Sequence, residues 1–125
     1  MATIFTYGSL MCNDIMFGVS GCEAESCMGT LKNYYRSKIK NEEYPGILPR
    51  AKSAVAGILY FDLPDSAIAR LDVFEGEYYD RRDVQIWTDE NVVHAAMTYV
   101  IKPQYYTLLT YSEWSYSQFL KVGKQ

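Results

Sequence analysis

The stretch of sequence most informative about the fold is Ser53-Ala54-Val55-Ala56-Gly57-Ile58-Leu59-Tyr60-Phe61. Its side chains alternate between two sets. One set is Val55, Leu59 and Phe61, and the other is Ala56, Ile58 and Tyr60, so both are largely apolar. Successive residues of a strand point to opposite faces, and a strand that is apolar on both faces is usually covered on both. We therefore expect a strand here with packing partners on either side.

A helix is expected directly after this strand, from Pro64 to about Phe74. Proline suits the first turn of a helix, and Gly76 is a stop signal. The expected apolar face, set by spacings of three and four, consists of Ala67, Ile68, Leu71 and Phe74. The residues expected to point toward water are Asp65, Ala69 and Asp72.

The remaining elements follow from apolar runs and turn signals on either side. Strands are expected at 2–7, at 22–39 with bends, at 47–48, at 82–87 and at 92–101. Turns are expected at 44–46 and at 88–91, and further helices at 11–19 and 112–122, with Ser112 as N-cap and Gly123 as stop. Strands come first, one helix follows, and a strand pair and a terminal helix close the chain. This order predicts an α+β fold with a mostly antiparallel or mixed sheet, which could curl into a barrel.

Length and composition restrict the possible functions. At 125 residues, of which 49% are apolar, we expect one domain over 1–125 with one core. A net charge of −3 without a dense Lys/Arg run argues against nucleic acid or a polybasic membrane anchor as partner. We expect a cytoplasmic protein, because the N-terminus lacks a signal-peptide pattern and no apolar segment approaches the roughly 20 residues that span a bilayer. Cys12, Cys22, Cys27 and His94 lack metal-ligand spacing, so no metal site is expected.

Glu75 is the side chain that departs from this pattern. It lies four residues after Leu71 and seven after Ile68, so it extends the apolar stripe of the helix. A carboxylate drawn out of water has a raised pKa, which suits a base that must hold and return a proton near neutral pH. Gly76 follows directly and would leave the carboxylate at a helix end beside a cavity.

A structural explanation for Glu75 competes with this one. A half-buried glutamate at a helix end often pairs with an arginine, and Arg81 and Arg82 are close in the sequence. Perturbed carboxylates occur in both settings. Spacing alone favours the ion pair over catalysis.

Two further features point to a pocket. In Tyr7-Gly8-Ser9-Leu10 a strand ends at a glycine turn, and successive backbone N–H groups there can form a small anion site. The chain also has twelve tyrosines. Tyrosines ordinarily lie at the edge of a core, with their hydroxyl groups reaching water. The alternative is that they line a pocket, where their hydroxyl groups orient a polar substrate. The tyrosines in or beside the expected core elements are Tyr34, Tyr35, Tyr44, Tyr60, Tyr78, Tyr79 and Tyr99.

Six short blocks of the sequence form one ordered set: Phe5–Leu10, Tyr44–Ile47, Val55–Tyr60, Leu71–Gly76 with Tyr79 and Arg81, Ala95–Val100, and Trp114 with Phe119. Together and in this order, they resemble the gamma-glutamylcyclotransferase-like family, which includes gamma-glutamylamine cyclotransferase and plant avirulence-induced relatives. The resemblance implies a small mixed, mostly antiparallel β-barrel flanked by helices. It also implies that Glu75 is the proton acceptor and that the loop Tyr7, Gly8, Ser9 and Leu10 binds substrate. Because these blocks occur together, the resemblance favours catalysis over a structural ion pair for Glu75.

The activity implied is the release of 5-oxoproline from a small gamma-glutamyl amine or peptide, without metal or cofactor. Glu75 would act as general acid and base, and Tyr79 would place a hydroxyl near it, whereas Arg81 would support the structure. The loop would hold either the substrate's carboxylate or the developing oxyanion. An acyl transferase or hydrolase using the same pocket, or a non-catalytic binder of a small anionic ligand, are the alternatives. The identity of the gamma-glutamyl compound, the oligomeric state and the role of the Tyr-rich C-terminus stay open at this point.

Overall fold

The computed structural model describes residues 1–88 and 91–122. Six strands, three helices and three short 3₁₀ turns follow one another along this part of the chain. In chain order they are β1 (Ala2–Thr6), η1 (Ser9–Met11), α1 (Asn13–Ser20), β2 (Ser26–Ile39), β3 (Pro45–Leu63), α2 (Asp65–Glu75), η2 (Gly76–Tyr78), β4 (Tyr79–Trp87), β5 (Val93–Ile101), η3 (Pro103–Leu108), β6 (Leu109–Glu113) and α3 (Tyr116–Val122). None of the helices within these residues is both long enough and apolar enough to cross a bilayer.

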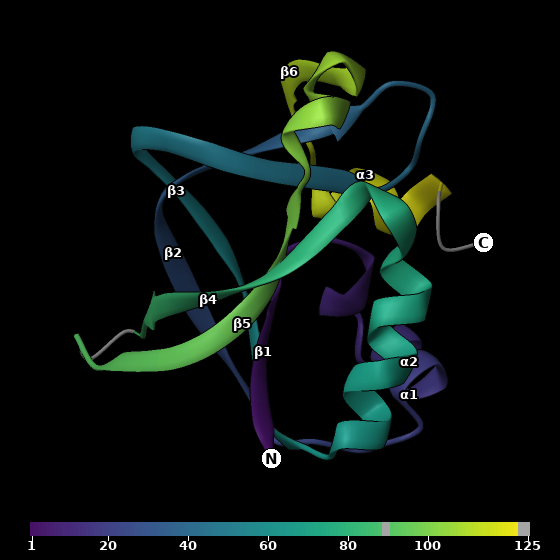
Figure 1. The fold of residues 1–125 in the computed structure, drawn as a ribbon, viewed down its shortest axis with the longest axis vertical. Helices are drawn as coiled ribbons and strands as arrows, with labels where there is room; N and C mark the ends of the chain where they lie inside the picture. Colours follow the sequence, from purple (N-terminus) through teal and green to yellow (C-terminus); the bar gives the residue numbers. More distant parts are fainter. Residues whose placement is uncertain (89–90, 123–125) are drawn as a thin grey trace.

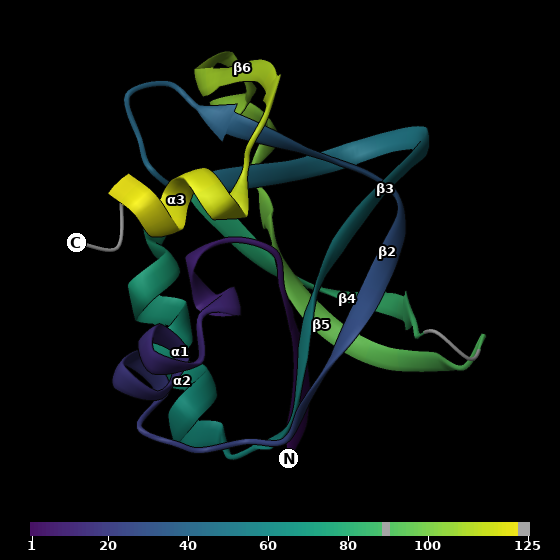
Figure 2. The same ribbon diagram turned by 180° about the vertical axis from the view of Figure 1, so that it is seen from behind.

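The strands close into a barrel. The order β3-β1-β5-β4-β2 returns to β3 through a β2–β3 pairing, and β6 adds to β2 outside this ring. Only β1 and β5 pair in parallel, and the other pairings are antiparallel. Figures 1 and 2 both place α1 and α2 side by side along one flank of the barrel. The predicted fold class, an α+β fold with a mixed, mostly antiparallel barrel flanked by helices, is confirmed.

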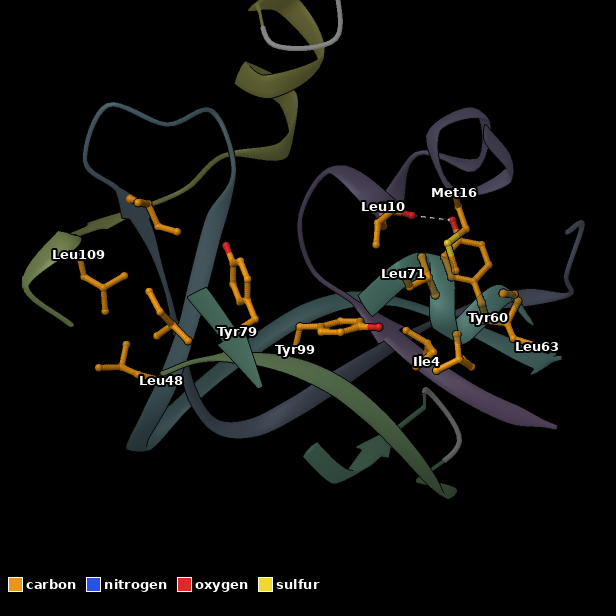
Figure 3. Packing of buried hydrophobic residues seen from close by; sticks show 14 residues of the cluster. Ile4, Leu10, Met16, Leu48, Tyr60, Leu63, Leu71, Tyr79, Tyr99 and Leu109 are labelled. Carbon is orange, nitrogen blue, oxygen red and sulfur yellow. Dashed lines mark hydrogen bonds between the residues drawn. The ribbon is translucent and has the colours of Figure 1, made fainter. Parts of the chain in front are cut away.

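Two apolar clusters lie on the two sides of the barrel wall. One fills the interior with residues from all five barrel strands and from Tyr7: Phe5, Tyr7, Leu31, Ile47, Val55, Leu59, Ile86, Ala96 and Val100. The other joins the outer wall to α1 and α2, as Figure 3 shows around Ile4, Tyr60, Leu63 and Leu71, and extends past Tyr99 to Leu109. The predicted two-faced strand is the segment of β3 between them, since Leu59 belongs to the first cluster and Tyr60 to the second. Ala56 is exposed because this part of the outer wall lies outside both clusters.

Helix α2 begins one residue later than predicted and ends at Glu75. Pro64 occupies the N-cap position in an extended conformation instead of the first turn. Gly76 ends the helix as predicted, with a φ of 77° that favours glycine. Ala67, Ile68 and Leu71 are buried as predicted, but Phe74 is 47% exposed. The expected apolar face was therefore wrong at its last member, because the helix end projects past the barrel wall toward a cavity.

Two predictions were wrong: the position of a turn and the start of the last helix. The turn placed at 44–46 lies earlier, where Asn41 has a φ of 64° and the Glu42 N–H donates to the Ile39 carbonyl. Pro45 opens β3 instead, and the first residue of a strand is a position that tolerates proline. The helix placed at 112–122 starts only at Tyr116, since Ser112 lies in β6. Pairing of β6 with β2 overrides the local helix signal there, and the Ser115 hydroxyl caps α3 by accepting from the Gln118 N–H.

The other boundaries moved by a few residues. The helix expected at 11–19 is α1 preceded by η1, and β1 ends at Thr6. The strand expected at 22–39 is β2, which starts at Ser26 and bends at Asn33 through a register shift. The pieces expected at 47–48 and 53–61 are parts of β3, β4 begins at Tyr79, and β5 begins at Val93. Of the turn at 88–91, residues 89–90 lie outside the described residues, as does Gly123.

Strands β1 and β3 lie very close together at Gly57, and this contact provides a test of barrel closure. A Cβ placed there would lie 2.1 Å from the Thr6 carbonyl oxygen of β1, a backbone atom. We expect Gly57→Ala to lower the free energy of unfolding by about 3 kcal/mol or more, because β1 must move away from β3. Urea denaturation measures this. The matched control is Gly18→Ala, at an exposed position of helix α1 where nothing lies within 4 Å. It should stabilise the protein by about 0.5–1 kcal/mol. Equal stability of the Gly57 variant and the wild type would contradict this account of closure.

Candidate active site

A cavity of about 260 Å³ opens where β1 and α2 both end. It is lined by Phe5, Thr6, Tyr7, Gly8, Ser9, Leu10, Tyr44, Pro45, Phe74, Glu75, Tyr79 and Tyr99. All six site residues predicted from the sequence are in this list, although they come from three separate segments. Of the others, Tyr44 and Tyr99 belong to the tyrosines singled out in the sequence, and Tyr44 and Pro45 to the second block. Phe74 was missed as a cavity residue because helical spacing assigned it to the core.

Glu75 is the ionisable carboxylate of this cavity. It is the last residue of α2 and is half-buried. Burial raises the pKa of its carboxyl group from 4.5 to about 8, because the charged form loses its water. Among the described residues, no hydrogen bond or ion pair offsets this loss. The group therefore changes charge in the physiological pH range.

The arginines suggested as partners for Glu75 are engaged elsewhere. Arg81 pairs with Asp72, and Arg82 lies 3.5 Å from Asp80. Asp72 also accepts a hydrogen bond of 2.7 Å from the Tyr99 hydroxyl. The competing prediction of an ion pair at Glu75 is therefore wrong. The arginine pairs with Asp72 instead, one helical turn earlier. Both Tyr99 and Glu75 are thus positioned by the last turn of α2.

Hydrogen bonds from tyrosine hydroxyl groups connect the segments of the cavity wall. Tyr79 donates to the Pro45 carbonyl at 2.7 Å, and Tyr7 donates to the Tyr99 carbonyl. Burial, with the nearby Glu75 charge, raises the pKa of Tyr79, and burial with the hydrogen bond to Asp72 raises the pKa of Tyr99, so both hydroxyls stay protonated. The Tyr79 proton is therefore directed at the backbone, and its oxygen lone pairs and ring remain for the cavity.

The loop Tyr7–Leu10 is held by hydrogen bonds to its carbonyl groups. The Met11 N–H donates to the Gly8 carbonyl at 3.0 Å, and the Tyr60 hydroxyl donates to the Leu10 carbonyl at 2.9 Å, the dashed line in Figure 3. These bonds use carbonyl groups of the loop and none of its N–H groups. The residues lining the cavity in the described part of the chain include no lysine or arginine. An anionic ligand group would therefore find no basic side chain among these lining residues.

Comparisons with known proteins agree with this fold. The family model described as "Gamma-glutamyl cyclotransferase, AIG2-like" matches residues 4–116. AIG2-like protein D of Arabidopsis thaliana is 30% identical over 134 residues, covering 100% of this chain and 88% of the relative. A solution structure of an Arabidopsis thaliana protein has a TM-score of 0.76 at 26% identity, covering 98% of this chain and 83% of its own. A structure titled gamma-glutamyl cyclotransferase has a TM-score of 0.73 at 18% identity, covering 83% of this chain and 73% of its own, a likeness of fold. The chain belongs to the AIG2-like gamma-glutamyl cyclotransferase family.

Proposed function

We propose that this protein is a gamma-glutamyl cyclotransferase that releases 5-oxoproline from a gamma-glutamyl amine or peptide, with Glu75 as general acid and base. The observation that carries the proposal is a carboxyl group with a pKa raised to about 8 in the wall of a cavity, where no described residue pairs with it. Membership of the family supports the substrate class. The role of each residue below is part of the proposal.

The reaction is a cyclisation within the substrate. Its α-amine attacks the γ-carbonyl carbon, and a new C–N bond closes a five-membered ring. The C–N bond to the leaving amine then breaks. Since the nucleophile is already part of the substrate, the enzyme contributes mainly by folding it into attack geometry, and effective molarities for such reactions are high. The aromatic walls of Tyr79, Tyr99 and Phe74 suit this constraint.

Proton transfer is the task of Glu75. An α-amine is largely protonated near neutral pH, so it must lose a proton before or during attack. Two protons leave this nitrogen on the way to the ring N–H of 5-oxoproline, one before attack and one as the new C–N bond forms. Glu75 accepts one of them and returns it to the departing nitrogen, and the other passes to solvent, from which the released amine takes up a proton. A carboxyl group with a pKa of about 8 can do both near neutral pH, whereas one of pKa 4.5 would be a weak proton donor. No net proton is gained or lost by the enzyme over one turnover.

The loop Tyr7–Leu10 is proposed to bind the substrate through backbone N–H groups. Either the α-carboxylate or the oxyanion that develops on the γ-carbonyl can occupy that position. The alternatives, a hydrolase or acyl transferase in which Glu75 activates water or a second amine, differ in product. Hydrolysis yields free glutamate, and cyclisation yields 5-oxoproline. A panel of gamma-glutamyl amines and peptides scored for both products decides between them, and binding without either product would favour the non-catalytic binder.

Replacing the proposed base tests the mechanism directly. We expect Glu75→Gln to reduce 5-oxoproline release by at least about a hundredfold, because the change is nearly isosteric and removes the proton acceptor. Circular dichroism should show a folded protein. The matched control is Glu77→Gln, two residues away, where the glutamate is exposed and outside the cavity wall, and which should keep wild-type turnover. Wild-type release by the Glu75 variant would rule out this residue as the base.

The rate should follow the ionisation of Glu75. Because the base must be deprotonated in the free enzyme, kcat/KM is expected to rise about tenfold per pH unit until it bends near pH 8. Steady-state assays between pH 5 and 8.5 measure this limb. A profile that is already level at pH 6 would contradict a base with this pKa.

Stability should depend on pH in a direction opposite to that of an ion-paired carboxylate. The folded pKa of about 8 lies above the ordinary glutamate value of 4.5, so between these values the folded state holds a proton that the unfolded state has lost. Stability is therefore lost as pH rises from about 4.5 to 8. We expect Glu75→Gln to be more stable than the wild type at pH 9, by on the order of 5 kcal/mol, and similar at pH 4.5. Urea unfolding at both pH values, with Glu77→Gln beside it, checks the sign; a Glu75 variant less stable at pH 9 would contradict it.

A further inference from the structure

Arg36 is a partly buried cation that lies outside the proposed mechanism. It lies in β2 opposite Ile47 of β3. Its Nη1 donates to the Tyr7 carbonyl at 2.8 Å and to the Ala56 carbonyl at 3.2 Å. Tyr7 precedes the glycine of the substrate loop, so this cation acts on the loop's first peptide bond.

Arg36 lies on the far side of this peptide from the cavity. It is absent from the cavity wall, whereas Tyr7 and Gly8 both contribute to it. Arg36 lines a separate hollow with Tyr35, Glu113 and Trp114 instead. The Tyr7–Gly8 peptide therefore separates the guanidinium from the space that a substrate would occupy.

The geometry of a trans peptide turns this contact into a constraint on the loop. No peptide bond in the described residues is cis. In a trans peptide, the C=O and N–H groups point in opposite directions in one plane. Since Arg36 holds the Tyr7 carbonyl from behind, the Gly8 N–H on the same plane is directed toward the cavity. A charge-assisted hydrogen bond to the carbonyl also polarises the peptide, which makes that N–H a stronger donor.

The C-terminal segment keeps Arg36 in place. The Trp114 ring centroid lies 5.4 Å from the guanidinium carbon, and the Trp114 indole N–H donates to the Glu43 carbonyl at 2.8 Å. Glu113 lies near enough for its charge to favour the charged guanidinium, against the desolvation that lowers the Arg36 pKa. The end of β6 and the residue after it thus support the cation from behind.

We propose that Arg36 is a positioning residue that holds the Tyr7–Gly8 peptide so that the Gly8 N–H faces the substrate cavity. The catalytic consequence rests on the proposed cyclotransferase function, but the effect on the peptide does not. A purely structural arginine would tie β2 to β3 and to the loop without affecting the donor strength of one N–H. The two roles are separable by measuring that N–H directly.

The first measurement needs no substrate. In isotope-labelled protein, the Tyr7 carbonyl ¹³C and Gly8 amide ¹⁵N resonances report the hydrogen bond at this peptide. We expect both to move upfield in Arg36→Met, which keeps the length and apolar contacts of the side chain and removes the donor. The matched control is Arg50→Met. Arg50 lies on β3 with its guanidinium carbon 4.6 Å from the Tyr35 ring centroid, so it is another arginine stacked on an aromatic ring, but it does not touch the loop. Both resonances should stay in place in that variant, and resonances unmoved in Arg36→Met would overturn the proposal.

The second measurement is activity on whichever gamma-glutamyl compound the wild type converts. We expect Arg36→Met to lose about tenfold or more in kcat/KM. Without Arg36 the Gly8 N–H is no longer held in one direction, so it stabilises the bound substrate or transition state less. Arg36→Lys should recover part of the loss, since Nζ can still reach one carbonyl, and Arg50→Met should match the wild type. A fall in kcat would assign the Gly8 N–H to the oxyanion, and a rise in KM to the carboxylate; either supports the proposal. Wild-type kcat/KM in Arg36→Met, despite moved resonances, would overturn it.

The failure of the two proposals can be told apart. If the wild type releases no 5-oxoproline from any substrate of the panel, the cyclotransferase function is wrong, and the resonances still decide whether Arg36 holds the peptide. If Arg36→Met does not fold, Arg36→Lys carries the test, because its single ammonium cannot reproduce both guanidinium bonds. Wild-type resonances and kcat/KM in the Lys variant would then overturn the proposal.

Discussion

Closure of the barrel is the constraint on which the rest of the structure depends. Strand β1 is only five residues long, yet it pairs with β3 on one side and with β5 on the other. Its approach to β3 is so close at Gly57 that a single methyl group would meet the Thr6 carbonyl. Closure sets where β1 ends, and the loop that follows it forms the wall of the cavity opposite Glu75.

The cavity combines a rigid frame with one poorly solvated charge. The hydroxyl groups of Tyr7, Tyr79 and Tyr99 bond to the protein itself, so they fix the wall's shape. Glu75 has no such bond within the described residues, and its raised pKa reflects a carboxylate that is costly to keep charged. Stability lost at one residue in this way is typical of groups positioned for proton transfer. Asp72, one turn earlier on α2, shows the contrast, since Arg81 and Tyr99 both bond to it.

The sequence pattern correctly predicted those elements in which apolar residues recur with a regular period. The strand over 53–61 and the helix over 64–74 have periodic apolar residues, and the stop signal of the helix, Gly76, agrees with the structure. Prediction was wrong at Ser112 and at Tyr44–Gly46, where strand pairing and not local preference decides the conformation. Phe74 continued a helical stripe in sequence, but the stripe is buried only as far as the barrel wall extends, so its ring lies at the cavity.

The sequence by itself determined the fold class, the family resemblance and the unusual position of Glu75, because these depend on residue types and on spacings along single segments. Only the tertiary structure decided that Arg81 pairs with Asp72 and not with Glu75, since this pairing depends on how β4 passes the end of α2. It alone also brought Arg36 behind the Tyr7 carbonyl, across 29 residues of chain. Such contacts arise when strands distant in sequence close into one barrel, and no local period encodes which residues then meet.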